Sequence, residues 1–399
     1  MANKNGGFIG TDGLDAPDPP TGVTPTVGDT SVSVAFTAPT DTGTSAITGF
    51  VATTDAGDGA TGSSSPISIT SLTNGTAYTA RVYAINAYGT SAPSDASSSF
   101  TPSALAGNVI YFAGGGDNVI EFRNVASTGN SSDFGDLTTT SEGGNGTASS
   151  TRGVFAKGKN NSGESRDIDY VTLVTTGNAT DFGDTTYQRT VLGSLGNDTR
   201  GIFAGGLLSS DRINVIDYIT IASTGNATDF GNLQRAKRGV GAAGSTTRGL
   251  FFGGDINGNS STNEIDRIEI ASTGNANNFG DLSTNRPQCV GVSSNTRAIA
   301  CTGTDSGGTA INILEYVTIA SLGNTTDFGD ATAAKQLAAG DGCGTLGILG
   351  GGYIASGGGT EIDVIESITI ASTGNGSDFG DLLAAKREHG AFSSAHGGL

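Results

Sequence analysis

The chain has 399 residues, including 65 glycines and no tryptophan, and its formal net charge is −18. Such an acidic chain repels phosphate backbones and anionic membrane surfaces, so nucleic acid is not an expected partner. No apolar run reaches the length of a membrane-spanning helix, and the first residues lack a signal-peptide core. Neither membrane insertion nor signal-directed export is therefore expected.

Cysteine and histidine are scarce. Cys289, Cys301 and Cys343 are the only cysteines, and none has a CxxC spacing, which predicts reduced, buried thiols. His389 and His396 are the only histidines, and both fall in the last predicted strand. The chain has too few histidines and cysteines for the usual metal sites or histidine-based triads, so we expect no metal, no cofactor and no catalytic residue.

Residues 1–17 form a polar, glycine-rich arm with too few apolar residues to fold by itself. Two interpretations are open. The arm is either a frayed terminus or a peg that becomes ordered on a partner protein.

Residues 18–103 read as a small β-sandwich. Residues 31–39 alternate polar and apolar side chains, which predicts a half-buried strand, and residues 47–55 form the next strand. A third strand follows Tyr78 and again alternates.

The segment that leads into this strand, Leu72-Thr-Asn-Gly-Thr-Ala-Tyr78, resembles the tyrosine-corner motif of fibronectin type III domains. The resemblance implies that the Tyr78 hydroxyl bonds to nearby backbone. Asn74 replaces the proline of the family, and Phe36 is expected to take the place of its early tryptophan.

A motif that consists of a Gly-Asn turn, an aromatic residue and a glycine occurs six times after residue 104. Its aromatic residues are Phe134, Phe182, Phe230, Phe279, Phe328 and Phe379, which lie 48, 48, 49, 49 and 51 residues apart. A period near 50 residues that consists of short strands is typical of four-stranded propeller blades.

The repeat resembles the kelch repeat, because a basic residue opens its first strand and a Gly-Gly pair ends its second. The pairs are Gly114-Gly115, Gly205-Gly206, Gly253-Gly254 and Gly350-Gly351, with Lys157-Gly158 and Thr302-Gly303 in the other two copies. The resemblance implies a six-bladed kelch-like β-propeller over residues 104–399. Residues 386–396 are an unpartnered first strand, so the C-terminal strand is expected to close the ring. The predicted fold class is therefore all-β, with an N-terminal fibronectin type III sandwich followed by this propeller.

Five basic residues each precede a predicted first strand: Arg189, Arg238, Arg286, Lys335 and Arg387. They would lie near one mouth of the central channel. Either they pair with neighbouring carboxylates between blades, or they form a cationic ring that attracts acidic glycans.

The loops between second and third strands differ among copies, whereas the turns between third and fourth strands are nearly constant. The variable loops are rich in residues that form adaptable hydrogen bonds, so their face is the predicted binding face. The candidate residues are Asn160, Asn161, Asp211, Asn257, Asn259 and Tyr353. Drift in unconstrained loops is the competing explanation.

The sequence of the repeats, Thr-Ile-Ala-Ser-Thr-Gly-Asn followed by Asp-Phe-Gly-Asp-Leu, resembles that of virion structural proteins of tailed bacteriophages, especially those of marine cyanobacteria. The resemblance implies a non-enzymatic virion protein, either tail- or fibre-associated or a decoration of the head surface. It implies assembly in the host cytoplasm, an oligomeric state in the particle, and attachment to other virion proteins through the arm and the sandwich. A host-surface glycan is a further expected partner. The alternative is a carbohydrate-active enzyme that acts on host polysaccharide.

Overall fold

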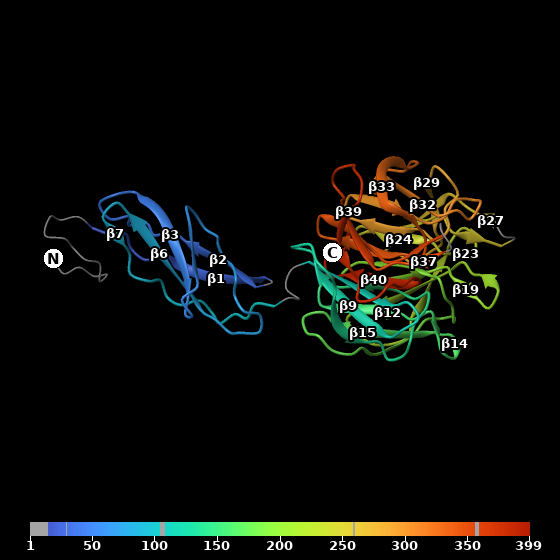
Figure 1. Cartoon of the computed structure of the whole chain (residues 1–399), viewed down its shortest axis with the longest axis horizontal. Coiled ribbons are helices and arrows are strands. Elements are labelled where there is room, and N and C mark those ends of the chain that lie inside the picture. The colour runs from blue at the N-terminus through green and yellow to red at the C-terminus, as the bar shows by residue number, and fades with distance from the viewer. Residues whose placement is uncertain (1–14, 29, 104–107, 258–259, 356–358) are drawn as a thin grey trace. The chain divides into compact units, whose positions relative to one another are not determined.

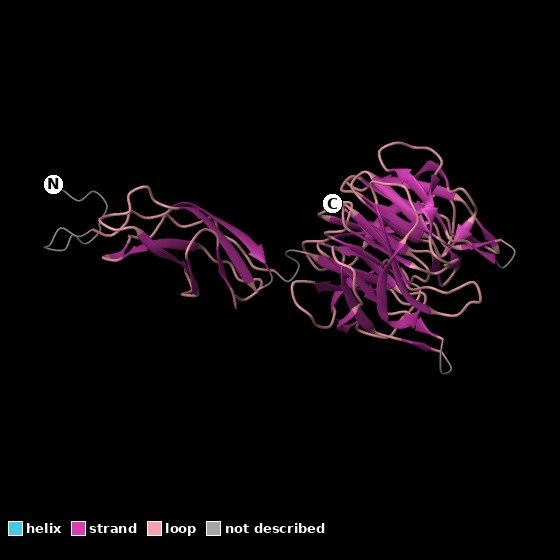
Figure 2. Cartoon of the chain, turned by 90° about the horizontal axis from the view of Figure 1, so that it is seen from above, coloured by secondary structure: helices cyan, strands magenta, loops and turns pink. Residues whose placement is uncertain are grey.

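The computed structural model describes residues 15–28, 30–103, 108–257, 260–355 and 359–399. The chain divides into two compact units, Met1–Gly107 and Asn108–Leu399. Strands, turns and loops make up the described residues, as predicted for an all-β protein, and these residues contain no helix (Figures 1 and 2). Accordingly, the described part of the chain has no helix that could cross a membrane.

Two antiparallel sheets build the first unit. One sheet has the order β1 (Thr21–Gly28), β2 (Ser31–Thr37) and β5 (Ile67–Ile69). The other has the order β4 (Gly59–Gly62), β3 (Ile47–Thr54), β6 (Ala80–Asn86) and β7 (Gly89–Thr90). The predicted alternation is present in β2, where Val32, Val34 and Phe36 are buried. The inner faces of both sheets contribute to one core, since Phe36 lies 4.8 Å from Phe50 between ring centroids.

The predicted tyrosine corner is confirmed. The backbone amide of Thr73 donates a hydrogen bond of 3.1 Å to the hydroxyl of Tyr78. Tyr78 is buried, so this bond satisfies a phenol that would otherwise lose its partner in the core.

The proposed arm extends too far in the prediction. Asp15 already belongs to the sandwich, because its amide donates to the Thr44 hydroxyl and its carbonyl accepts from the Asn86 side chain. Residues 1–14 lie outside the described residues, so the remainder of the arm stays a prediction.

The described residues of the second unit contain six four-stranded antiparallel sheets, besides short hairpins. Sheet 1 contains β11 (Asn145–Ala148), β12 (Arg152–Ala156), β15 (Asp167–Thr172) and β16 (Thr180–Asp184). Sheet 2 contains β17 (Gly193–Gly196), β18 (Arg200–Ala204), β21 (Val215–Thr220) and β22 (Thr228–Asn232). Sheet 3 contains β24 (Gly241–Gly244), β25 (Arg248–Phe252), β28 (Glu264–Glu269) and β29 (Asn277–Asp281). Sheet 4 contains β30 (Val290–Ser293), β31 (Arg297–Cys301), β32 (Ile311–Thr318) and β33 (Thr326–Lys335). Sheet 5 contains β34 (Ala339–Cys343), β35 (Leu346–Gly350), β38 (Val364–Thr369) and β39 (Ser377–Asp381).

Sheet 6 joins the two ends of the repeat region. Its strands, in sheet order, are β40 (His389–Ser393), β8 (Val109–Gly114), β9 (Val119–Asn124) and β10 (Ser132–Asp136). The predicted pairing of the C-terminal strand is thus present, with Ala391 opposite Phe112. In Figure 1 the red β40 and the cyan β9 mark the two ends of the chain that share this sheet, with β8 between them in strand order.

The first strands of the six sheets contact one another in a closed circuit. Strand β11 contacts β17, and the contacts continue through β24, β30, β34 and β40 back to β11. Apolar clusters join sheets 1 and 2, 2 and 3, 3 and 4, 4 and 5, and 5 and 6. Between sheets 6 and 1, the Tyr111 hydroxyl donates to the carbonyl of Leu173 at 3.0 Å.

The repeated Gly-Asn turn binds the neighbouring sheet. In one copy, the Gly225 amide donates to the carbonyl of Phe182 at 2.8 Å, and Asn226 Oδ1 accepts from the Asp184 amide at 3.0 Å. A Cβ on Gly183 would lie 2.5 Å from the Gly225 carbonyl oxygen, so this approach requires glycine. The same pair of bonds recurs from sheet to sheet, and Gly129 and Asn130 make it to Phe379 and Asp381. The uniformity of the turn therefore reflects contact between sheets as well as turn geometry.

Short hairpins extend the loops between second and third strands. They are β13 (Lys159–Asn160) with β14 (Gly163–Glu164), β19 (Leu207–Leu208) with β20 (Asp211–Arg212), β26 (Asp255–Ile256) with β27 (Ser260–Ser261), and β36 (Tyr353–Ile354) with β37 (Thr360–Glu361). Strand β23 (Lys237–Arg238) also pairs with β26. In sheet 5 the glycine pair that leads into the hairpin is Gly351-Gly352, one residue later than predicted, since it is these two glycines that have positive φ.

The cysteine prediction is confirmed. All three cysteines are buried free thiols. Burial raises the pKa of Cys343 to about 12, which keeps the sulfur in its unreactive thiol form at neutral pH.

Candidate functional site

A buried ion pair recurs in every sheet of the second unit. Each pair joins a cation to a carboxylate on the third strand. The pairs are Lys157–Asp169, Arg189–Asp217, Lys237–Asp266, Arg286–Glu315, Lys335–Glu366 and Lys386–Glu121. All twelve side chains are almost completely buried.

Each carboxylate also holds the chain that arrives from the preceding sheet. Asp217 lies 2.6 Å from the Arg189 guanidinium and accepts a hydrogen bond of 3.1 Å from the Thr186 amide. Thr186 follows β16 of sheet 1, so one carboxylate connects two sheets. Burial lowers the pKa of Arg189 from its ordinary value, and the charge of Asp217 opposes this shift. The paired arrangement offsets the desolvation of both ions.

Sheet 1 makes the same pair from a different position. Ser141 occupies the place that a basic residue takes in the other sheets, and its hydroxyl donates to the Lys157 carbonyl. Lys157 replaces the first glycine of the pair after the second strand and reaches Asp169 at 3.3 Å. Lys157 thus comes from a different position in the repeat than the other cations, but its charge lies at the corresponding carboxylate.

The predicted cationic ring needs correction. Arg189, Arg286 and Lys335 are buried in ion pairs and present no charge to a ligand. Arg238 and Arg387 do not belong to the six buried ion pairs, because the adjacent Lys237 and Lys386 form the pairs in their sheets.

Arg238 and Arg387 instead have partners on the loop side. Arg238 pairs with Asp255 at 3.2 Å, whereas Arg387 pairs with Glu361 at 3.4 Å and lies over the Tyr353 ring. The structure therefore favours pairing with carboxylates over a ring that attracts anions.

The predicted loop residues lie on separate hairpins and do not converge. Asn160 and Asn161 belong to the sheet 1 loop, Asp211 to β20 and Tyr353 to β36. Asn257 Oδ1 accepts from the Arg212 amide at 3.4 Å and so links two loops. Asn259 lies outside the described residues, and one ring face of Tyr353 is already covered by Arg387.

A basin of about 660 Å³ lies on this loop face. The hairpins β13–β14 and β19–β20 contribute its walls. Its polar lining includes Glu142, Lys159, Ser162, Glu164, Gln188, Thr190, Ser209, Arg238 and Glu388. The volume falls within the range of about 300–1,000 Å³ that is usual for small-molecule sites.

Next to the basin, six residues with left-handed backbone form a collar. They are Gly143, Val191, Gly239, Gln288, Leu337 and Glu388, with φ between 51° and 66°. Amides bond to carbonyls from one member to the next, such as Val191 to Gly143 at 2.6 Å and Gly143 to Glu388 at 2.7 Å. All six line one small cavity. The four members other than glycine hold strained backbone, a feature that concentrates at functional sites.

Glu142 and Glu388 meet where the basin joins the collar. Burial raises the pKa of Glu388, and the charge of Glu142 and a hydrogen bond between the two side chains raise it further. Arg387 and Lys159 oppose this shift. Neither glutamate was predicted. A comparison of the six copies could have found Glu388, since that position otherwise carries only uncharged residues.

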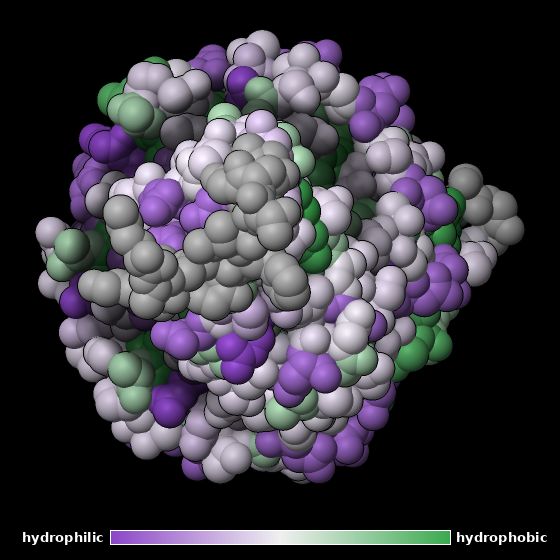
Figure 3. Space-filling view, turned by 90° about the vertical axis from the view of Figure 1, so that its left-hand side faces the viewer, coloured by the Kyte–Doolittle hydropathy of each residue, from purple (hydrophilic) through white to green (hydrophobic). Residues whose placement is uncertain are grey.

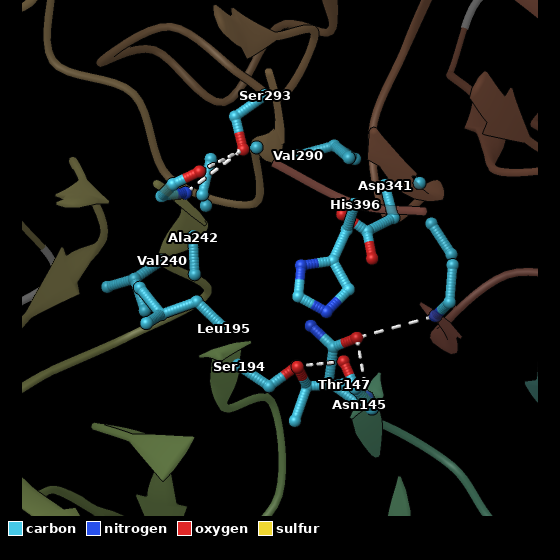
Figure 4. A pocket seen from close by; sticks show the side chains of 18 of the residues that line it. Asn145, Thr147, Ser194, Leu195, Val240, Ala242, Val290, Ser293, Asp341 and His396 are labelled. Atoms are coloured by element: carbon cyan, nitrogen blue, oxygen red, sulfur yellow. Dashed lines mark hydrogen bonds between the residues drawn. The ribbon is translucent and has the colours of Figure 1, made fainter. Parts of the chain in front are cut away.

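An internal cavity runs between the first strands of all six sheets. Asn145, Asp341 and His396 surround this space in Figure 4. The Gly398 amide donates to His396 Nδ1, so His396 Nε2 carries the proton and donates to the Ala148 carbonyl at 2.7 Å.

Asp341 makes a pH dependence of stability predictable. Burial raises its pKa from 3.8 to about 8, although the Gly342 and Ser393 backbones oppose the shift. The folded state therefore holds this proton more tightly, and this contribution to stability falls as pH rises from about 4 to about 8. We expect Asp341→Asn to be increasingly more stable than the parent chain across this range in urea unfolding. A stability difference that does not change with pH would contradict the assignment.

Apolar side chains do not identify a docking surface. The large apolar residues that are exposed among the described ones are Val27, Tyr88, Val174, Tyr187, Leu322 and Leu383. On the side shown in Figure 3, apolar areas are small and separate.

Comparison with known families identifies the first unit. The fibronectin type III domain family matches residues 18–100. Residues 18–100 are a fibronectin type III domain. The confirmed tyrosine corner lies within this fibronectin domain. No curated protein matches the chain.

Proposed function

We propose that the second unit is a six-bladed, kelch-like β-propeller in a non-enzymatic virion structural protein of a tailed phage. The closed circuit of first strands supports the propeller, as do the six turns that bind from sheet to sheet. The Gly-Gly pairs with positive φ after the second strands support the kelch resemblance. The protein is tail- or fibre-associated or decorates the head, and it is oligomeric in the particle.

One observation carries the functional proposal. The chain uses nearly identical residues for the contacts between sheets, whereas the variable hairpins all extend from the same ends of the sheets. A rigid ring that displays variable polar loops suits binding of a partner protein or a host-surface glycan. The arm and the fibronectin domain would attach the chain to other virion proteins.

The experiment compares three chains for incorporation into particles and for binding to host cells. They are the full chain, a chain without residues 1–14, and a loop variant in which Asn160, Asn161, Asp211, Asn257, Asn259 and Tyr353 become alanine. Deletion of residues 1–14 should abolish incorporation into particles. The loop variant should still be incorporated, but it should bind host cells or particle neighbours at least about tenfold more weakly, the equivalent of about 1.4 kcal/mol. Folding is checked by circular dichroism. Normal incorporation without the arm, or unchanged binding by a folded loop variant, would refute the corresponding part.

A carbohydrate-active enzyme is the alternative. Glu142 and Glu388 are a carboxyl pair in an open basin, which is the kind of group such an enzyme needs. Turnover of host polysaccharide by the purified protein would favour the enzyme.

A further inference from the structure

We infer that the basin and collar bind a basic side chain, lysine or arginine, of a partner protein, with Glu142 and Glu388 as its acceptors. This inference rests on the proposed display of the loop face. It assigns a site and a partner chemistry to that face, and it concerns residues other than the predicted loop residues.

The first argument is the surplus of acceptors at this site. Glu142 and Glu388 both line the basin. Gln288 Oε1, in the same collar, is buried and has no hydrogen-bond partner among the described residues. Acceptors without donors favour a ligand that only donates, and ammonium and guanidinium groups are donors without acceptors.

His389 adds a further acceptor beside the collar. It is 5% exposed and lines both the collar cavity and the internal cavity. Its ring nitrogens form no hydrogen bond of good geometry in the described structure, although the Gly350 backbone is close enough to oppose the pKa shift. Burial and the nearby Lys386 lower the pKa of His389 to about 3, so the ring is neutral and one nitrogen can accept.

Charge gives the second argument. Two carboxylates in contact repel each other unless a proton or a cation lies between them. Lys159 supplies part of the compensation, since its ammonium lies 3.3 Å from Glu142, but both side chains are about half exposed. An exposed pair of this kind contributes at most about 1 kcal/mol, so an incoming cation can displace it. Arg238 and Arg387 pair with Asp255 and Glu361, so neither forms an ion pair with Glu388 among the described residues.

The shape of the site favours a single inserted side chain over a flat protein surface as its ligand. The basin is open and concave, it adjoins the small collar cavity, and Glu388 lines both. A long, flexible basic side chain can cross the basin and place its charge at the carboxyl pair. Among the described residues that line the basin none is aromatic, so these residues offer no stacking platform for a sugar ring.

The experiment follows the side-chain carboxyl carbons of glutamate by NMR in the whole protein. The chain has nine glutamates, so selective 13C labelling gives few resonances, and single glutamine variants assign them. The probes are capped tripeptides Gly-Arg-Gly, Gly-Lys-Gly and, as a neutral control, Gly-Gln-Gly. Spermidine tests a free polyamine as the source of the charge.

We expect the arginine and lysine peptides to shift the Glu142 and Glu388 resonances and to lower the pKa at which Glu388 titrates. A fall of one unit corresponds to a tenfold preference of the peptide for the ionised glutamate. Glu388→Gln and Glu142→Gln should each weaken binding at least about tenfold, the equivalent of about 1.4 kcal/mol. Lys159→Gln should strengthen it.

Two features keep the result interpretable. Glu388→Gln should fold, because Gln288 already occupies a collar position with nearly the same φ, 59° against 51°. Glu269→Gln, which removes a half-exposed carboxylate that pairs with Arg248 outside the basin lining, is the matched control and should bind as the parent chain does. Equal effects of the arginine and glutamine peptides, or spermidine binding as tightly as the peptides, would overturn the inference. Such failure leaves the loop-variant test of the proposed function unaffected.

Discussion

Deletion of residues 384–399 is expected to unfold the second unit or lower its melting temperature severely. The deletion removes β40 and exposes the edge of β8, a strand in which every residue is buried. It also removes Phe392, whose loss alone costs about 3–5 kcal/mol, and leaves the Glu121 carboxylate buried without Lys386, which costs a similar amount. Together these losses approach the whole stability of a typical domain, about 5–15 kcal/mol.

Calorimetry of the parent and truncated chains measures this effect. The fibronectin domain has its own core and should keep its transition, which makes it an internal control. A second control removes only Gly397, Gly398 and Leu399, which follow β40, and should cost much less. An unchanged transition of the second unit after the larger deletion would show that β40 does not close the ring.

Breaking one buried ion pair should produce the second large effect. Arg189→Met leaves Asp217 ionised in the core, and we expect a loss of about 3–5 kcal/mol in the free energy of unfolding. Arg238→Met breaks a more exposed pair and should cost no more than about 1 kcal/mol. Urea unfolding of both variants gives the comparison. Equal losses would mean that burial does not distinguish the two pairs.

Sheet 1 offers a rescue of the same interaction. Lys157→Gly should destabilise the chain as strongly as Arg189→Met, because Asp169 then lacks its cation. Adding Ser141→Lys places a basic residue where the other sheets have theirs and should restore most of the loss. Failure of this rescue, with Ser141→Lys alone tolerated, would mean that sheet 1 needs its cation at position 157 for another reason.

Much of the architecture was readable in the sequence because it is encoded in local patterns. The alternation in residues 31–37 places Val32, Val34 and Phe36 inward in any strand pairing, and the Tyr78 corner depends on residues only five apart. The 48- to 51-residue period gave one set of strands per copy. Because the first copy lacks a first strand, the C-terminal strand could only pair with β8 of that copy.

The candidate site was less readable because it depends on register and on ring closure. Lys237 and Arg238 are adjacent, as are Lys386 and Arg387, and neighbouring residues in extended backbone point to opposite sides. Only the observed pairing shows that Lys237 and Lys386 enter the core while their neighbours face the loops.

The sequence by itself determined the all-β class, the repeat and its period, and the identity of the strand that completes sheet 6. The tertiary structure decided which charges are buried and which meet. Glu142 and Glu388 come from opposite ends of the repeat region and share no local pattern. They are neighbours because β40 lies between β34 and β11 in the circuit of first strands, which brings the end of the chain to the beginning of the repeat.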